Sequence, residues 1–310
     1  MSERAIERGA VDDETVDDAS TGELGTRTAA VRTIAVVGAG AMGSGIAGVV
    51  AAAGFAVRLH DTSPTALERG AARVRRRAPD ASLMLTTDLA DLAVGADLVI
   101  EAAPEDLELK RSIFGVLDVS APAHAVLATN TSQLSVTALA ASTTRPERVV
   151  GMHWFNPPER MRLIEVVRAI TTSDATVDLI RGVAEACDKQ VVVVADRQGF
   201  VTTRALAALL IEAMRMHEEG VASAADVDTA VHLGLNHPMG PLALADYVGL
   251  DVMLAIADSL TLSLGERFRP PQGLRKRVEA GHLGRKTGRG YHRYEDPPGE
   301  GRTGSGGGPT

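Results

Sequence analysis

The sequence predicts an α/β protein in which a Rossmann-like, doubly wound sheet is followed by a smaller all-helical domain. Three observations lead to this prediction. A glycine-rich turn at 38–43 stands between a continuous apolar run and a helical segment. Short strand-like runs then alternate with helical segments up to about residue 196, and beyond that point only helical patterns occur. Such an order is typical of an open, mostly parallel sheet with a second domain.

The chain has 310 residues, 45% of them hydrophobic, which is enough for one large or two moderate cores. Residues 1–30 are acidic and show no sustained period, so we expect a disordered leader there. Residues 296–310 are rich in Pro, Gly and Ser, and we expect a disordered tail. We place the Rossmann domain at 31–197 and the helical domain at 198–295.

The composition excludes several classes of partner and site. A net charge of −8 argues against nucleic acid and anionic membrane surfaces. No apolar run reaches the roughly 18 residues that span a bilayer, and no signal pattern precedes the first strand. The single cysteine, Cys187, excludes an internal disulfide and indicates the reducing cytoplasm. The histidines lack metal-ligand spacing, so we expect no metal.

The first strand is expected at 33–37, a continuous apolar run typical of a strand that is buried on both faces. A helix should follow from about 42 to 53, then a strand at 56–60 and a helix that begins at Pro64. Further strands are expected at 83–85, 97–101, 125–129, 149–153, 163–167 and 191–194. Helices of the second domain are expected at 200–219, 223–233, 240–264 and 272–281.

Residues 38–43 read G-A-G-A-M-G, which matches the pattern G-x-G-x-x-G. The first glycine permits a tight turn, the second lets the backbone approach a pyrophosphate, and the third allows close helix–strand contact. Asp61 ends the next strand, where it can accept both ribose hydroxyls of NAD and would repel the 2′-phosphate of NADP. The alternative is a glycine-rich turn with a structural aspartate. The candidate cofactor contacts here are Gly38, Gly40, Ala41, Met42, Gly43 and Asp61.

Other polar residues follow later strands at the edge where ligands bind in such sheets. Glu105 and Lys110 follow the fourth strand, although alone they fit a solvated helix start equally well. The run T-N-T-S at 129–132 can hydrogen-bond a substrate oxygen or form a polar turn. The four arginines within 73–77 form a solvated face or bind an anionic substrate tail.

The stretch 151–167, GMHWFNPPERMRLIEVV, carries the candidate chemistry. His153 and Glu165 stand twelve residues apart, a spacing that suits two neighbouring strands joined by the Asn-Pro-Pro turn. A histidine paired with a carboxylate can move a proton near neutral pH. A histidine before an irregular turn is, however, more often structural when it is considered alone.

Five blocks in order resemble the L-3-hydroxyacyl-CoA dehydrogenases, and within them the 3-hydroxybutyryl-CoA type. They are GAGAMGSGIA, TNTS, HWFNPPERMRLIEVV, PMGPLALADYVGLD and GHLGRKTGRGYHRY, and they run from about residue 34 to residue 294. The resemblance implies a cytoplasmic NAD-linked oxidoreductase of fatty-acid metabolism. It would oxidise a short-chain L-3-hydroxyacyl-CoA to the 3-ketoacyl-CoA, catalyse the reverse reduction, and form a homodimer through the helical domain.

The resemblance also assigns residues to roles. It places the catalytic histidine at His153 and its carboxylate partner at Glu165, with Ser132 contacting the substrate oxygen. It implies that four further residues line the cofactor: Glu105, Lys110, Asn156 and Lys286.

One departure concerns the start of the second domain, where relatives commonly read GF-x-x-N-R. This chain has Thr203 at the asparagine position. Threonine keeps a hydroxyl but loses the reach and the second donor of the amide. The sequence therefore leaves open whether Thr203, a water molecule or no group takes over the contact that the asparagine makes with the substrate. The sequence is also compatible with two alternative functions: a gulonate-type sugar-acid dehydrogenase, and a dinucleotide-binding protein without turnover.

Overall fold

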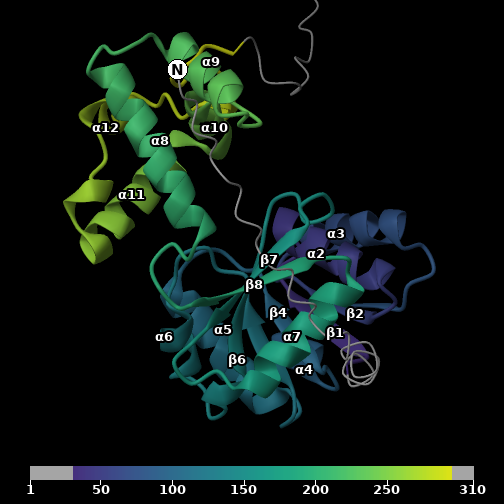
Figure 1. Cartoon of the computed structure of the whole chain (residues 1–310). Coiled ribbons are helices and arrows are strands. Elements are labelled where there is room, and N and C mark those ends of the chain that lie inside the picture. The colour runs from purple at the N-terminus through teal and green to yellow at the C-terminus, as the bar shows by residue number, and fades with distance from the viewer. Residues whose placement is uncertain (1–30, 295–310) are drawn as a thin grey trace, which may run out of the picture.

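The computed structural model describes residues 31–294, and the predicted leader and tail therefore lie outside the described residues. Within that range the chain forms a sheet with helices on both faces, followed by a group of helices (Figure 1). The predicted fold class, a Rossmann-like sheet followed by a helical domain, is confirmed.

The sheet has eight strands in the order β3-β2-β1-β4-β5-β6-β7-β8. Neighbouring strands run parallel except β6 and β7, which are antiparallel. Each predicted strand is present with ends that differ by no more than two residues. The strands are β1 (Thr33–Val37), β2 (Ala56–His60), β3 (Leu83–Thr86), β4 (Leu98–Glu101), β5 (Val126–Thr129), β6 (Val149–Trp154), β7 (Leu163–Arg168) and β8 (Gln190–Ala195).

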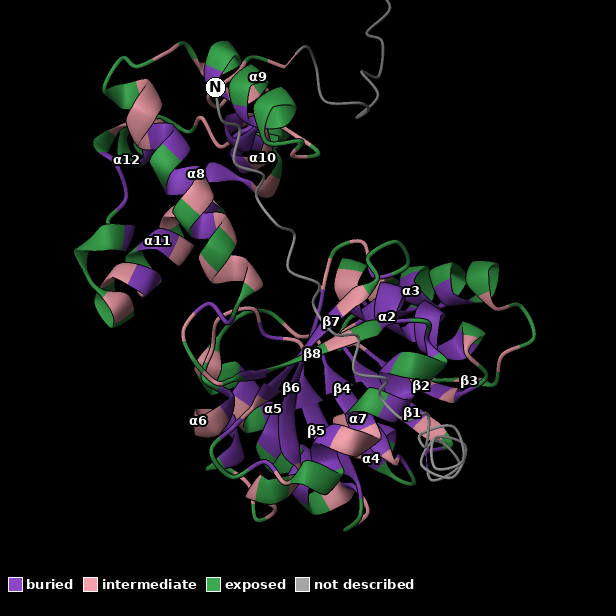
Figure 2. Ribbon diagram, in the orientation of Figure 1, coloured by how far each residue is buried: buried purple, intermediate pink, exposed green. Residues whose placement is uncertain are grey.

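Two separate cores lie on the two faces of this sheet because successive side chains of a strand point to opposite faces. In β1, Ile34 and Val36 belong to one core, whereas Ala35 and Val37 belong to the other. The first core is covered by α2 (Ala41–Ala52), α3 (Pro64–Arg77) and α7 (Asp174–Ala186). The second is covered by α4 (Leu89–Ala93), α5 (Leu107–Ser120) and α6 (Val136–Ala140). Figure 2 shows the strands buried between these helices.

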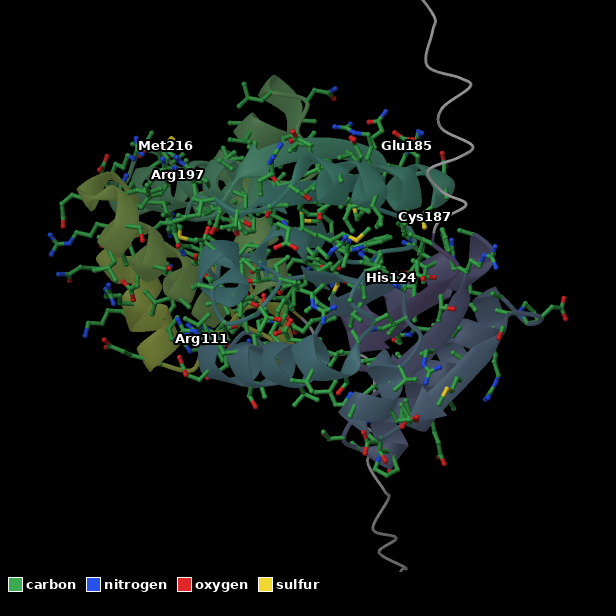
Figure 3. The ribbon with its side chains drawn as sticks, turned by 90° about the horizontal axis from the view of Figure 1, so that it is seen from below. Arg111, His124, Glu185, Cys187, Arg197 and Met216 are labelled. Atoms are coloured by element: carbon green, nitrogen blue, oxygen red, sulfur yellow. The ribbon has the colours of Figure 1, made fainter. Side chains whose placement is uncertain are left out.

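The helices α3 to α7 each begin after a residue whose side chain accepts a hydrogen bond from the first helical turn. Ser63 precedes Pro64 as predicted, and its hydroxyl accepts a hydrogen bond from the Ala66 N–H. Asp88, Asp106, Ser135 and Ser173 cap four other helices in the same way. Cys187 ends α7 (Figure 3) and is buried in the first core, as predicted for a small core residue. Burial raises the pKa of its thiol to about 12, so the thiol is protonated at neutral pH.

The second part consists of helices packed around their own cores. They are α8 (Thr202–Glu218), α9 (Ala224–Gly234), α10 (Pro241–Val248), α11 (Leu250–Leu264) and α12 (Gln272–Glu279). Short 3-10 turns of this part are η2 (Glu266–Phe268) and η3 (Arg285–Thr287), whereas η1 (Pro146–Arg148) precedes β6 in the first part.

The prediction of one helix over 240–264 is wrong. The chain breaks at Gly249, whose φ is 105°, and α11 leaves α10 at an angle of 98°. A positive φ cannot continue a right-handed helix, and glycine adopts it without steric cost. The apolar pattern runs through both helices, so hydrophobicity alone did not reveal the break.

The segment after α12 folds around the buried Asp246 of α10. The Asp246 carboxylate accepts hydrogen bonds from the N–H groups of Tyr291 and His292 and from the hydroxyl of Tyr294. A Cβ on Gly290 would lie 1.9 Å from the Asp246 Oδ1 atom, so this close approach requires glycine. The block G-H-L-G-R-K-T-G-R-G-Y-H-R-Y therefore serves in part to enclose one buried carboxylate.

Within residues 31–294, no single helix is both long and apolar enough to cross a membrane; α10 and α11 meet that criterion only when they are taken together across their bend.

Candidate active site

The three motif glycines play different steric roles at the turn from β1 to α2. Gly38 has a φ of 94°, and a Cβ there would lie 2.8 Å from the Ala102 carbonyl oxygen. A Cβ on Gly43 would lie 1.8 Å from the carbonyl oxygen of Gly38. A Cβ on Gly40 would meet nothing within 4 Å. The fold itself requires Gly38 and Gly43, whereas Gly40 leaves space open outside the loop.

That open space lies at the start of α2. Gly40 is the N-cap and contributes no side-chain hydrogen bond, so the N–H groups of the first turn remain available to an anion. Gly40 and Ala41 are exposed, whereas Gly43 is buried. Asp61 follows β2, and its carboxylate accepts from the N–H groups of Ala39 (2.8 Å) and Ser63 (2.9 Å). The loop, the helix start and the neighbouring aspartate together fit the pyrophosphate and ribose of a dinucleotide.

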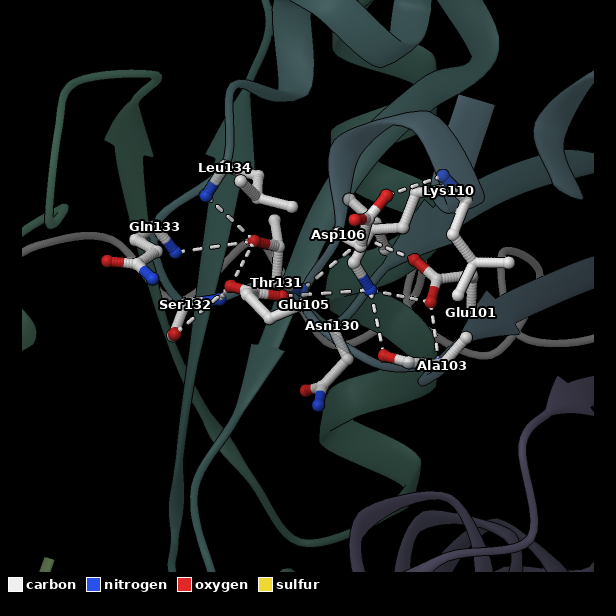
Figure 4. Close-up of polar contacts among 12 residues, drawn as sticks. Glu101, Ala103, Glu105, Asp106, Lys110, Asn130, Thr131, Ser132, Gln133 and Leu134 are labelled. Atoms are coloured by element: carbon white, nitrogen blue, oxygen red, sulfur yellow. Dashed lines mark hydrogen bonds and ion pairs between the residues drawn. The ribbon is translucent and has the colours of Figure 1, made fainter. Parts of the chain in front are cut away.

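A buried carboxylate that the sequence analysis did not single out ends β4. Glu101 is fully buried and accepts hydrogen bonds from Lys110 Nζ (2.6 Å) and the Ala103 N–H (2.6 Å) (Figure 4). It also accepts a hydrogen bond from Thr129 Oγ1 (2.7 Å). It pairs in register with Thr129 of β5. The available signal was an acidic residue at the end of an otherwise apolar strand, L-V-I-E.

Lys110 lies inside the protein rather than on its surface. Its residue exposure is 1%, and its Nζ also donates to the Ala103 carbonyl (3.1 Å) and lies 3.7 Å from the Glu105 carboxylate. The alternative of a solvated helix start is therefore wrong for Lys110. Its contact with the cofactor stays a prediction.

Glu105 and Ser132, predicted separately, meet in the structure. The Glu105 Oε1 atom accepts from the Thr131 hydroxyl (2.7 Å), the Ser132 N–H (2.9 Å) and the Ser132 hydroxyl (3.2 Å) (Figure 4). The loops after β4 and β5 are thus tied together at the carboxyl edge of the sheet.

His153 and Glu165 form a buried hydrogen-bonded pair. They face each other in the antiparallel register of β6 and β7, and His153 Nδ1 lies 2.8 Å from Glu165 Oε2. An ionised carboxylate can only accept, so Nδ1 carries a proton, and in the neutral form of the ring Nε2 has the free lone pair. The rings of Phe155 and Phe200 flank the imidazole, with centroids 4.5 Å and 5.7 Å away.

Glu165 has three further donors, all from the start of the helical part. Oε1 accepts from the N–H groups of Val201 (3.2 Å) and Thr202 (2.9 Å), and Oε2 accepts from the Thr202 hydroxyl (2.9 Å). Burial raises the pKa of Glu165, but the hydrogen bonds from His153 and Thr202 outweigh burial and lower that pKa below its usual value. Glu165 is therefore ionised at neutral pH.

The remaining predicted residues lie in three different elements. Asn156 is exposed in the turn after β6, and Thr203 is half-buried in the first turn of α8. Lys286 is exposed in η3 and forms an ion pair with Asp251 at 2.6 Å. The hydroxyl that reaches the His153–Glu165 pair belongs to Thr202 rather than to Thr203.

Three arginines of α3 line a cavity of about 220 Å³ beside α2. Arg73, Arg76 and Arg77 share it with Ser44 and with Glu159 from the turn after β6. Among residues 31–294, by contrast, no group of three or more His, Cys, Asp or Glu side chains is arranged to hold a metal ion.

Comparisons with known proteins decide the family. Residues 33–197 match the family model of the 3-hydroxyacyl-CoA dehydrogenase NAD binding domain, and residues 199–294 match the model of the corresponding C-terminal domain. The chain belongs to the 3-hydroxyacyl-CoA dehydrogenase family. It is accordingly an NAD-dependent oxidoreductase, and the family resemblance noted in the sequence is confirmed.

Individual relatives agree with the family assignment. The chain is 44% identical over 267 residues to a probable 3-hydroxybutyryl-CoA dehydrogenase of Bacillus subtilis, covering 81% of this chain and 93% of that protein. A second probable 3-hydroxybutyryl-CoA dehydrogenase, from Deinococcus radiodurans, is 42% identical to this chain. The similarity covers 80% of this chain and 95% of that protein. The crystal structure of (S)-3-hydroxybutyryl-CoA dehydrogenase from Ralstonia eutropha superposes with a TM-score of 0.82 at 38% identity, covering 86% of this chain and 100% of that chain.

Alanine at position 40 and alanine at position 43 should affect different properties. Gly40→Ala places a methyl group in the open space that the pyrophosphate needs, so we expect NADH to bind about tenfold more weakly with an unchanged melting temperature. Gly43→Ala clashes with backbone and should lower the melting temperature. Fluorescence titration with NADH and thermal unfolding measure the two effects; a Gly40→Ala variant with normal NADH affinity would contradict the role of the open space.

Removing the Glu101 charge should destabilise the protein far more than removing an exposed one. Glu101→Gln leaves the Lys110 ammonium buried beside a neutral amide, which should cost about 3 kcal/mol. The matched control is Glu108→Gln, which breaks the exposed pair with Arg111 and should cost less than about 0.5 kcal/mol. Urea unfolding of both variants makes the comparison, and equal losses would show that burial does not distinguish the two ion pairs.

Proposed function

We propose that this chain oxidises a short-chain L-3-hydroxyacyl-CoA, with 3-hydroxybutyryl-CoA as the expected substrate, to the 3-ketoacyl-CoA and catalyses the reverse reduction. The observation that carries the proposal is the buried His153–Glu165 hydrogen bond of 2.8 Å in a chain that has an NAD-binding domain. The names of the similar proteins, which refer to 3-hydroxybutyryl-CoA, support the choice of acyl group.

Catalysis requires that a hydride leave C3 of the substrate while its hydroxyl loses a proton. NAD, when bound, supplies the nicotinamide carbon that accepts the hydride. The His153 Nε2 atom takes the hydroxyl proton as general base, and in the reverse direction it returns that proton to the keto oxygen. Glu165 holds Nδ1–H, fixes the tautomer and stabilises the imidazolium that forms. The buried position of the pair excludes water from the proton transfer.

The other predicted site residues fit roles around this step. Ser132 contacts the substrate oxygen, and Thr203 contacts the substrate from the first turn of α8. The cofactor-lining role is proposed for Gly38, Gly40, Ala41, Met42, Gly43, Asp61, Glu105, Lys110, Asn156 and Lys286. Support comes from the open space at Gly40 and from the contact that joins Glu105 to Ser132.

The arginine cavity of α3 suits the phosphates of the CoA moiety. Arg73 already donates to the Ala41 carbonyl and to the Ser44 hydroxyl at the start of α2, whereas Arg76 and Arg77 are exposed. Guanidinium groups bind phosphate through several charge-assisted hydrogen bonds. We therefore assign the anionic tail of the substrate to this cavity.

A homodimer through the helical part completes the proposal. Large apolar side chains are exposed there, including Leu233 and Leu235 at the end of α9 and Leu262 of α11. Exposed apolar surface of this kind is typical of protein interfaces.

A cytoplasmic location is supported by cysteine usage, since the single Cys187 is free and buried.

Alanine at position 153 tests the acid–base assignment. His153→Ala should reduce kcat by about two to four orders of magnitude with acetoacetyl-CoA and NADH while NADH binding is retained. Wild-type turnover in this variant would remove His153 from its role.

In the same spectrophotometric assay, turnover of gulonate by the wild-type protein would favour a sugar-acid dehydrogenase. NADH binding without any turnover would favour a non-catalytic protein.

Two neighbouring arginines provide a matched test of the CoA site. Arg76 lines the cavity and Arg75 does not, although both are exposed on α3. Arg76→Ala should raise KM for acetoacetyl-CoA about tenfold with little change in kcat, because a charge-assisted contact to phosphate is lost. Arg75→Ala should leave KM unchanged, and so should Arg76→Ala when the substrate is the N-acetylcysteamine thioester, which lacks the nucleotide. An equal effect on both thioesters would contradict the assignment.

A further inference from the structure

The first turn of α8 is capped by a side chain from another part of the fold. Val201 occupies the N-cap position and provides no side-chain hydrogen bond. Glu165, on β7, supplies the missing acceptor, because its Oε1 atom receives the N–H groups of Val201 and Thr202. A helix start needs such an acceptor for its free N–H groups. The carboxylate that holds the catalytic histidine is therefore also the cap of the helix that opens the second part.

The other oxygen of this carboxylate is shared between two donors. Oε2 accepts from His153 Nδ1 at 2.8 Å and from the Thr202 hydroxyl at 2.9 Å. Glu165 is 0% exposed, so no solvent molecule replaces a donor that is lost. Hydrogen bonds to one oxygen from two directions restrict rotation of the carboxylate about its Cγ–Cδ bond.

We propose that Thr202 is a positioning residue for the acid–base pair: its hydroxyl fixes the orientation of the Glu165 carboxylate, and through it the orientation of the His153 imidazole. The proposal rests on the function proposed above. Without the hydroxyl, Oε1 keeps its two N–H donors, but Oε2 is held by the histidine alone. The carboxylate and the ring can then rotate together away from the arrangement that aims Nε2 at the substrate.

The contact also joins the catalytic pair to the position of the helical part. Thr202 and Thr203 are consecutive residues of the first turn of α8, and Thr203 is the proposed substrate contact. A shift of α8 relative to β7 therefore changes the orientation of the Glu165 carboxylate and the position of the substrate contact at the same time. Thr202 thus couples the orientation of the base to the position of α8.

The charge state of Glu165 depends on the same hydroxyl. Among the described residues, its hydrogen-bond donors are one titratable group, His153, and the neutral groups of Val201 and Thr202. Burial raises the pKa of Glu165, whereas hydrogen bonds from His153 and Thr202 lower it. A donor that stabilises the ionised form lowers the pKa of a carboxyl group, so loss of the hydroxyl moves that pKa upward.

The test compares Thr202→Val, which removes the hydroxyl at nearly constant shape, with Thr202→Ser, which keeps it. With acetoacetyl-CoA and NADH, Thr202→Val should reduce kcat about five- to tenfold, the equivalent of one hydrogen bond of ordinary strength, and leave NADH binding unchanged. The acidic limb of the kcat profile should move to higher pH by about half to one unit, because Glu165 protonates sooner. Thr202→Ser should restore both properties.

The matched control is Thr229→Val on α9, which removes a hydroxyl that bonds only to the Ala225 carbonyl of its own helix. It should change neither kcat nor the pH profile. The proposal is overturned if Thr202→Val keeps the wild-type kcat and pH profile, or if Thr202→Ser behaves like Thr202→Val. It is also overturned if Thr202→Val lowers only the melting temperature.

A second measurement separates this proposal from the proposed function. The pKa of Glu165 is lowered in the folded protein, so the ionised carboxylate stabilises the fold at any pH above the pKa that Glu165 has in the unfolded chain. This stabilisation of the fold is lost as the pH falls through the pKa of Glu165 in the folded protein. The melting temperatures of wild type and Thr202→Val should differ at pH 7 and converge in acid, with or without turnover. An active His153→Ala variant would overturn the acid–base function, whereas an inactive His153→Ala beside an unaffected Thr202→Val would overturn only the positioning role.

Discussion

The ionised Glu165 carboxylate is buried completely, and a buried charge is tolerated only when hydrogen-bond donors replace water. Four donors do so: the His153 ring, the Val201 N–H, and the N–H and hydroxyl of Thr202. They come from β6 and from the start of α8, so the two parts of the chain meet at one side chain. The tautomer of the histidine and the capping of α8 both follow from this arrangement.

The same physical solution occurs at the end of β4. Glu101 is also fully buried and is neutralised by Lys110 and by the hydroxyl of Thr129. The ammonium of Lys110 then holds the loop that carries Glu105, and Glu105 holds Ser132. Two buried carboxylates on neighbouring regions of the sheet thus orient the polar groups at its carboxyl edge, one through an ion pair and the other through a histidine.

Much of this architecture was predictable because its signals are local. The β1–loop–α2 unit, the eight strands and the pairing of His153 with Glu165 depend on apolar runs, turn residues and short spacings. The errors arose where the signal is not local. The apolar pattern of 240–264 continued across Gly249, although the backbone turns there. Glu101 looked like one more strand residue, because only the approach of Lys110 and Thr129 gives it a role.

By itself, the sequence determined the fold class, the family resemblance, the glycine loop with Asp61 and the identity of the histidine–carboxylate pair. The glycine loop with Asp61 and the histidine–carboxylate pair depend on residue types at short spacings, and the fold class and the family resemblance depend on the order of such segments along the chain. Only the tertiary structure decided which atoms share which hydrogen bonds. Thr202 rather than Thr203 reaches Glu165, across 37 residues of chain. A difference of one position at a helix start changes the direction of a side chain, and that direction is set by how α8 packs against β7.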